Sequence, residues 1–547
     1  MSAREDFASV SEEIIATSMA FDPVRATFIG VHDHDDRLPD FTPAAVDDHV
    51  RRLDTLVARL DGIDDVALSP TDGVDLEVLR ARVAASVFDL KDIARFRWDP
   101  LTWDPASGLH ALAIRDFAPA QERCLSAERR LDDLPRFLAD ARVTLGEMSA
   151  IHVETAIDRL EGFDAVLDGL HPLGPLDAAS VDAARDAVDQ HGRWLTDQLP
   201  HARRDPRLGV RLYSAALWHH LDEEVAPVQV LEWAEAHLDV VNARMREVAA
   251  EYLDDSVRSP DVVRRALADM ADRAAVVPTM VLPTVAQALE RTTAFVRDRD
   301  LVSLVGEPIE IVPMPRIHHG VAPAYCDAPG ALESAALESG GLPTFVAVAP
   351  PPAGWSEDRI RSFLREYNTD LLHDLTIHEA MPGHVVQLAH ARRVPTSRVR
   401  RMTSSGVFVE GWAVYAEEMM VERGYRPDDE PRAHLRIHLQ QLKMQARMTL
   451  NAILDARVHG GDIDEPEAIS LLRRRGFQEE QEAVGKWRRA LLTAVQLPTY
   501  FVGWRGVRSL IDDVRFLHPD WSDRQVHDLI LSEGSLGPRH LRALLGL

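Results

Sequence analysis

Apolar residues recur at intervals of three and four along most of this chain, a spacing that places them on one face of an α-helix. In residues 44–63 that face comprises Val46, Val50, Leu53, Leu56, Val57 and Leu60. The same spacing occurs in residues 75–93, 120–160, 180–200, 227–253, 260–275 and 281–298, and it resumes from about 356 to the end. We therefore expect a mainly α protein, and 547 residues are enough to bury a large core.

Residues 301–355 have a different pattern. Short alternations of apolar and polar residues, bounded by Pro and Gly, predict strands within 306–315 and 341–352. We expect an N-terminal helical part (1–300), a small strand-bearing insert (301–355) and a C-terminal helical part (356–547). Because no flexible linker separates them, they should form one compact helical body with a central cleft and a small β-sheet beside the helix at 371–390.

Charge and composition exclude several classes of partner. The formal net charge of −27 disfavours binding to nucleic acid and to anionic lipid. The N-terminus has acidic residues where a signal peptide would be basic, and no apolar run is long enough to span a membrane. Cys124 and Cys326 cannot provide a disulfide framework, although a single bridge between them stays open. A cytoplasmic location is the expectation.

The stretch "HEAMPGH" (378–384) contains half of a zinc-peptidase signature, His378-Glu379. The next histidine, His384, lies six positions after His378, and on a regular helix the two would be about 120° apart and about 9 Å along the axis. Pro382 and Gly383 can distort the helix, and a bulge of two residues would return His384 to the face of His378. A second reading stays open, in which "PGH" begins a new helix with proline at its first position.

A second stretch, "VEGWAVYAEE" (409–418), places Glu410 and Glu417 on one side of an otherwise apolar helix. Buried carboxylates are costly unless they are paired or bind a metal. A third protein ligand from a second helix would complete a catalytic zinc site with one position left for water. The alternative is a surface glutamate with an ion-pair partner.

Together, these two stretches resemble the bacterial family catalogued as domain of unknown function 885, which is similar to the thermolysin-like (gluzincin) zinc metallopeptidases. Residues 21–42, 454–472 and 497–510 resemble other segments of that family, so the resemblance covers most of the chain. It implies a zinc ion bound by His378, His384 and Glu410, with Glu417 supporting a ligand. Val385 departs from the family pattern, in which a histidine is frequent at this position.

The resemblance implies a zinc-dependent hydrolase, a metallopeptidase acting on short peptides. Glu379 would serve as general base toward a zinc-activated water. Tyr500 and His459 are candidates to stabilise the oxyanion, on resemblance alone. Ordinary structural roles remain open for both: a core phenol for Tyr500, and a histidine at a helix C-terminus for His459.

The strand at 343–349 is a candidate dock for an extended peptide, since a substrate can add to a sheet edge. Two other functions stay open. One is a zinc hydrolase that cleaves a non-peptide amide or ester, and the other is a non-catalytic binding protein that retains the fold. The presence of Glu379 disfavours the second, because a metal-binding relic needs no general base.

Overall fold

The structure is a computed structural model that describes residues 2–223, 225–256, 259–315, 317, 324–334, 341–351, 354–394 and 396–547. It confirms a mainly α fold with a small sheet. The N-terminal helices are α1 (Ala3–Phe21), α2 (Pro23–Ile29), α3 (Pro43–Asp61), α4 (Pro70–Phe88), α5 (Ser107–Ile114), α6 (Ala120–Thr144), α7 (Ala150–Leu160) and α8 (Phe163–Leu170). They are followed by α9 (Ala178–Gln198), α10 (Gly209–Leu221), α11 (Pro227–Leu253), α12 (Val262–Arg273) and α13 (Val281–Arg299).

Three strands come next: β1 (Ile309–Pro313), β2 (Ala324–Asp327) and β3 (Thr344–Val348). The first C-terminal helices are α14 (Glu357–Glu366), α15 (Thr369–Glu379), α16 (His384–Arg393), α17 (Arg398–Met402), α18 (Gly406–Glu422) and α19 (Ala433–Gly460). The chain ends with α20 (Glu465–Arg475), α21 (Glu480–Leu492), α22 (Pro498–Leu517), α23 (Asp523–Leu531) and α24 (Pro538–Leu545).

Most predicted helices are present within a few residues, and the one expected at 227–253 coincides with α11. The stretch 120–160 is instead two helices, α6 and α7. The chain leaves the first helix at Leu145, whose backbone is extended, and the N–H of Gly146 donates a hydrogen bond to the carbonyl of Arg97. A tertiary partner therefore ends a helix that apolar spacing alone would continue.

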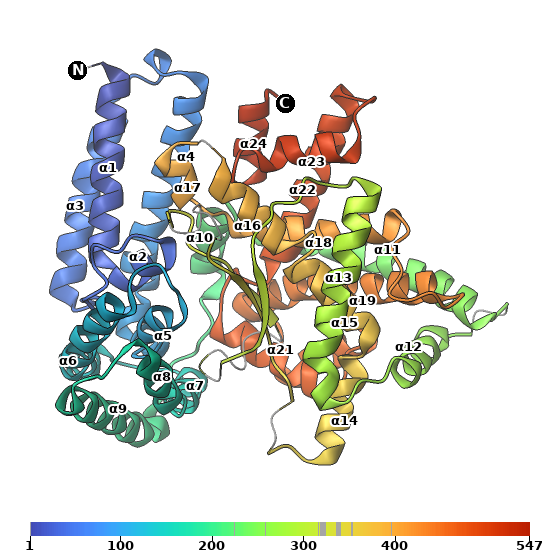
Figure 1. Cartoon of the computed structure of the whole chain (residues 1–547), viewed down its shortest axis with the longest axis horizontal. Helices are drawn as coiled ribbons and strands as arrows, with labels where there is room; N and C mark the ends of the chain where they lie inside the picture. Colours follow the sequence, from blue (N-terminus) through green and yellow to red (C-terminus); the bar gives the residue numbers. More distant parts are fainter. Residues whose placement is uncertain are drawn as a thin grey trace.

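The sheet has the order β1-β3-β2, with β3 parallel to β1 and antiparallel to β2. In Figure 1 the strands lie between the N-terminal helices and the helices that follow the sheet, and they contact α13 and α15. The expectation that residues 343–349 dock a peptide is wrong in its geometry, because β3 is the central strand and both of its edges are already paired. The sequence reading missed β2, which is the edge strand beside α15.

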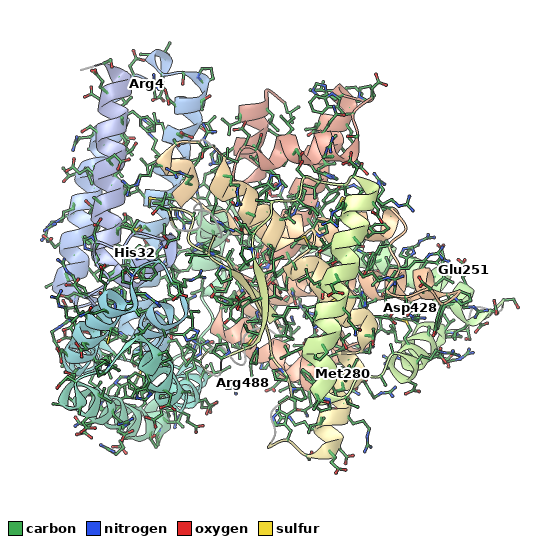
Figure 2. All side chains as sticks on the ribbon, viewed as in Figure 1. Arg4, His32, Glu251, Met280, Asp428 and Arg488 are labelled. Atoms are coloured by element: carbon green, nitrogen blue, oxygen red, sulfur yellow. The ribbon has the colours of Figure 1, made fainter. Side chains whose placement is uncertain are left out.

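The core does not follow the predicted part boundaries. One buried apolar cluster includes Phe7 of α1, Val346 of β3, Leu372 of α15 and Leu541 of α24. Charged side chains lie over the outside, among them Arg4 on α1 and Glu251 on α11 (Figure 2). Cys124 and Cys326 are both free thiols. None of the described helices is long and apolar enough to cross a membrane. The boundaries at 300 and 355 stay predictions.

Candidate metal centre

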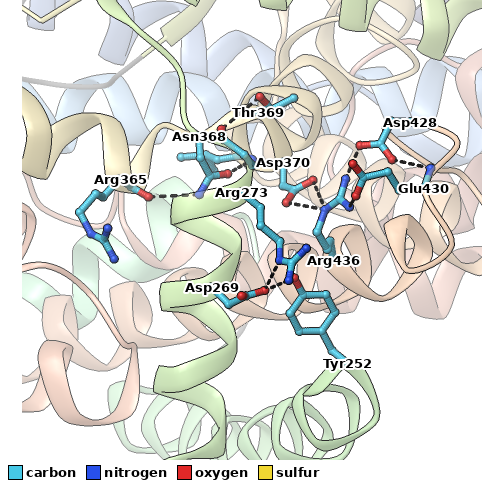
Figure 3. Close-up of polar contacts among 12 residues, drawn as sticks. Tyr252, Asp269, Arg273, Arg365, Asn368, Thr369, Asp370, Asp428, Glu430 and Arg436 are labelled. Carbon is cyan, nitrogen blue, oxygen red and sulfur yellow. Dashed lines mark hydrogen bonds and ion pairs between the residues drawn. The ribbon is translucent and has the colours of Figure 1, made fainter. Parts of the chain in front are cut away.

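The helix that carries His378 is fixed at its N-terminal end by polar contacts (Figure 3). Asn368 caps α15 by accepting a hydrogen bond from the N–H of Leu371 at 3.1 Å. Asp370, fully buried in the first turn, pairs with Arg436 of α19 at 3.2 Å. Arg436 also donates to Asp428 and Glu430. Burial raises the pKa of Asp370 to about 6, although Arg436 opposes this shift. The pair sets the position of α15 on α19.

α15 ends at Glu379 and a separate helix, α16, begins at His384. The predicted two-residue bulge within one helix is therefore wrong, and the alternative of a second helix is correct, except that His384 and not Pro382 is its first residue. At Gly383 a Cβ atom would lie 1.8 Å from the carbonyl oxygen of His378, so only glycine permits this close return of the chain. The indole N–H of Trp412 in α18 donates to the carbonyl of Pro382 at 2.9 Å and holds the connection against α18.

The break brings the three predicted ligands together. His378 Nε2 lies 3.4 Å from Glu410 Oε2, and His384 Nε2 lies 3.7 Å from the same oxygen. One ligand atom from each residue falls within 4.8 Å of the other two. Tetrahedral zinc with ligand bonds of about 2.0–2.1 Å separates its ligands by about 3.3 Å, so the observed spacing is close to that of a metal site.

The surroundings of these atoms also fit a cation. Glu410 Oε2 is buried, and among the described residues it receives no hydrogen bond of good geometry despite its closeness to His378. Burial lowers the pKa of His384 to about 4, which leaves a neutral imidazole at pH 7. Burial opposes ionisation of Glu410, but His378 and His384 outweigh it and lower the pKa of this carboxyl. Two imidazoles and a carboxylate are donors that zinc accepts.

His378 is oriented from its other side by Glu417. The Nδ1 atom of His378 lies 2.6 Å from Glu417 Oε1, so that Nδ1–H donates and Nε2 faces Glu410. Burial would lower the pKa of His378, but the two carboxylates outweigh it and raise the pKa well above its ordinary value. The pocket thus favours one positive charge at Nε2, which a proton or a metal ion can supply.

The sequence reading missed Asp374, one turn before His378 on α15. It is fully buried, and neither of its oxygens has a hydrogen-bond partner among the described residues. Burial, reinforced by the nearby Glu417, raises the pKa of Asp374 well above its ordinary value. Burial also raises the pKa of Glu417. The two carboxyls form a buried acidic pair behind His378.

Glu379 lies beside the ligands in a cavity of about 460 Å³ that His378, His384 and Glu410 also line. The backbone N–H of Cys326 in β2 lies close enough to favour the ionised form of the Glu379 carboxyl. Burial raises the pKa of Glu379 to about 7, a value suited to proton transfer near neutral pH. Tyr325 and Cys326 bring the edge strand to the same cavity.

Tyr500 of α22 lines this cavity, and its ring centroid is 6.4 Å from that of His378. Its hydroxyl oxygen accepts a hydrogen bond from Arg489 at 3.1 Å, which leaves the O–H proton free to donate. Burial raises the pKa of Tyr500, so the phenol stays protonated at neutral pH.

His459 is not brought to the site, and its assignment to the oxyanion is withdrawn. It does not line the cavity, and both of its ring nitrogens have backbone partners. Nδ1 accepts from the N–H of Leu208 at 3.2 Å, and Nε2 lies 2.9 Å from the carbonyl of Thr493. Burial lowers the pKa of His459 to about 4, although its backbone contacts act in the opposite direction. The histidine joins α19 to two loops and has a structural role.

Comparisons with known proteins agree with this fold. The model of the family described as "Bacterial protein of unknown function (DUF885)" matches residues 23–545. A candidate lipoprotein of unknown function from Shewanella oneidensis has 26% sequence identity and a TM-score of 0.79, over 99% of this chain and 100% of that one. A candidate lipoprotein from Colwellia psychrerythraea has 15% identity and a TM-score of 0.78, over 100% and 99% of the two chains. No curated protein matches.

Proposed function

The chain belongs to this bacterial family of unknown function, and from that premise and the geometry of the site we propose that it is a zinc-dependent hydrolase, most specifically a metallopeptidase of short peptides. The observation that supports the proposal is the convergence of His378, His384 and Glu410 within 4.8 Å, from three helices. Glu379 lines the same cavity, and burial raises the pKa of its carboxyl to about 7, which suits proton transfer near neutral pH. The relation to the thermolysin-like peptidases is part of the proposal.

In the proposed mechanism each residue of the site has a separate role. Zinc bound by His378, His384 and Glu410 would lower the pKa of a bound water to about 7 and polarise the substrate carbonyl. The carboxylate of Glu379 takes a proton from the attacking water and returns it to the leaving nitrogen. The Tyr500 hydroxyl donates to the oxygen that becomes negative as the carbonyl is attacked. Its orientation is held by Arg489.

The metal is tested first. Elemental analysis of the purified protein should find about one zinc per chain, and His384→Ala should lose it. His390→Ala is the matched control, because His390 lies further along α16 and its ring hydrogen-bonds to the carbonyl of Ser303, away from the candidate metal ligands. It should retain zinc. Two histidines and a carboxylate also suit iron(II), so finding iron or no metal in the wild type would overturn the zinc assignment.

The general base is tested second. Glu379→Gln should keep its zinc and lose turnover of a peptide panel by at least about 100-fold, since proton transfer contributes about 10²–10⁴-fold. Unchanged turnover would remove Glu379 from the mechanism. The panel should include amide and ester substrates without a peptide bond, because the same residues could hydrolyse those. Zinc without turnover of any substrate would favour a binding protein.

A further inference from the structure

Two arginines, Arg489 of α21 and Arg159 of α7, line the cavity of the metal centre. Neither forms an ion pair with a carboxylate among the described residues. Among the described residues, the carboxyl groups that line the cavity are those of Glu379 and Glu410, and the proposed function assigns these to catalysis and metal binding. The cavity therefore has an acidic side at the ligands and a cationic side, where no described carboxylate forms an ion pair with either arginine.

Arg489 is the more buried of the two, with 8% exposure. Its Nε atom donates to the amide oxygen of Gln496 at 3.1 Å, and an NH2 group donates to the Tyr500 hydroxyl at 3.1 Å. Both acceptors are neutral, so these contacts orient the guanidinium, while Glu410 and Asp455 attract its charge from a distance without forming an ion pair. A buried charge without an ion-pair partner is costly. The arrangement is stabilised when an anion enters the cavity.

Arg159 adds a second unsatisfied donor. Its Nε atom is buried and has no hydrogen-bond partner among the described residues. Together with Arg489 it also lines a second hollow, of about 330 Å³, which shares these two side chains with the first. The two guanidinium groups therefore stand at the boundary between the metal cavity and a neighbouring space.

Arg489 is unlike the other buried arginines of the described chain, which have carboxylate partners, whereas Arg159 is half-buried. Arg115 pairs with Asp327, Arg392 with Glu307, Arg400 with Asp75 and Arg436 with Asp370. In a chain of net charge −27, carboxylates are plentiful, so an unpaired buried arginine does not arise from a shortage of partners. Guanidinium groups bind carboxylates in a planar, two-point geometry.

We propose that Arg489 and Arg159 bind a carboxylate of the substrate, and that the substrates are short peptides with a free C-terminal carboxylate close to the cleaved bond. The inference rests on the proposed function and narrows its substrate class. Among the described residues that line the cavity, the carboxylate partners for a free α-amine are the two glutamates used by the metal site. A cavity of about 460 Å³ is in the range of small-ligand sites and suits a short peptide.

The test compares short N-acylated peptides that differ only at the C-terminus, as a free acid or as an amide. The acid should have a kcat/KM at least about 10-fold higher, since hydrogen bonds to charged groups contribute about 1.5–3 kcal/mol. Arg159→Gln should raise KM for the acid by about 10-fold and leave the amide unchanged. Arg489→Lys keeps the charge and loses the two-point geometry, so it should weaken the preference without unfolding the site.

Arg488→Gln is the matched control. Arg488, labelled in Figure 2, is next to Arg489 in sequence but pairs with Glu154 at the surface. This variant should keep the full preference for the acid. If it loses the preference as strongly as Arg159→Gln does, the effect is general electrostatics and the inference is wrong.

A binding measurement separates the inference from the proposed function. Calorimetry with Glu379→Gln should show the acid peptide binding at least about 10-fold more tightly than the amide. If the wild type hydrolyses acid and amide equally, the carboxylate inference is wrong and the hydrolase stands. If it hydrolyses neither, the hydrolase is wrong, and the inference is then judged by binding alone: equal affinity for both peptides overturns it.

Discussion

The two ring nitrogens of His378 face two different carboxylates, Glu410 and Glu417, and this division decides which nitrogen can bind a metal. Changing Glu417 to glutamine keeps the shape of the side chain but removes the charge that favours the Nδ1–H donor. Partners of this kind typically contribute about 10–100-fold to metal affinity. We expect Glu417→Gln to weaken zinc binding by at least about 10-fold, measured by competition with a chromophoric chelator.

Glu418→Gln is the control for that measurement. Glu418 is the next residue of α18, and it accepts a hydrogen bond from the indole of Trp504 at 2.8 Å, on a different side of the helix. Its substitution should leave zinc affinity unchanged. Equal affinity in Glu417→Gln and the wild type would mean that Glu417 does not orient the ligand.

For individual residues, the sequence allowed predictions within short motifs. It did not show which residues far apart in the chain contact one another. The segment 378–384 and Glu410 could be predicted as candidate ligands because the spacing and residue types are local. His459 was misassigned because its partners, Leu208 and Thr493, are tertiary. Arg159 reaches the cavity from a helix far from the motifs, and no local pattern marks it.

Among the elements, α18, which carries Glu410, packs closely against α22, which carries Tyr500. A Cβ atom on Gly503 would lie 2.1 Å from the carbonyl oxygen of Val407, so the two backbones touch. Gly503→Ala must therefore push α22 away from α18. We expect a loss of about 3 kcal/mol in the free energy of unfolding, measured by urea titration, together with reduced turnover because Tyr500 moves.

Gly485→Ala provides the comparison. Gly485 lies in the exposed part of α21, and a Cβ atom there would meet nothing within 4 Å. Because alanine is favoured over glycine inside a helix by about 0.5–1 kcal/mol, this variant should be slightly more stable than the wild type. A Gly503→Ala protein as stable as Gly485→Ala would show that the two helices can separate without cost.

The elements themselves were largely predictable because amphipathic spacing reports which face of a helix is buried. Apolar spacing predicted α11 correctly. It could not show that α6 ends before Leu145, because the chain there is held by a tertiary hydrogen bond from Gly146 to Arg97. It also missed β2, since four residues carry too little periodicity. In the segment 378–384, Pro382 and Gly383 predicted an interruption of the helix. They did not predict the new helix that begins at His384, or the hydrogen bond from Trp412 of α18 to the connection.

Across the whole molecule, ion pairs join the N-terminal helices to the segment around the sheet. Arg115, just after α5, pairs with Asp327 of β2, which leads into the metal cavity. His32, labelled in Figure 2, joins the loop after α2 to Glu333, 301 residues later in the sequence. These contacts couple the stability of the N-terminal part to the edge strand that faces Glu379.

The His32 contact makes this coupling depend on pH. Nδ1 of His32 lies 2.8 Å from Asp35, and Nε2 lies 2.8 Å from Glu333. Burial would lower the pKa of His32, but these two carboxylates outweigh it and raise the pKa to about 9. The unfolded value is about 6.5. The stabilisation is therefore complete below pH 6.5 and is lost as pH rises to about 9, because only the unfolded state releases its proton across this window.

We expect the wild type to exceed His32→Gln in unfolding free energy by about 1–2 kcal/mol at pH 6, after allowance for partial exposure, and by almost nothing near pH 10. Urea unfolding of both proteins at several pH values measures this difference in unfolding free energy. Ionisable groups elsewhere in the chain contribute equally to both proteins, so their contributions cancel. His171→Gln serves as control, since His171 is exposed and lies 3.8 Å from Asp168. A wild-type advantage that stays constant or grows from pH 6 to 10 would mean that His32 stabilises the fold by packing against Phe117 and not by its charge.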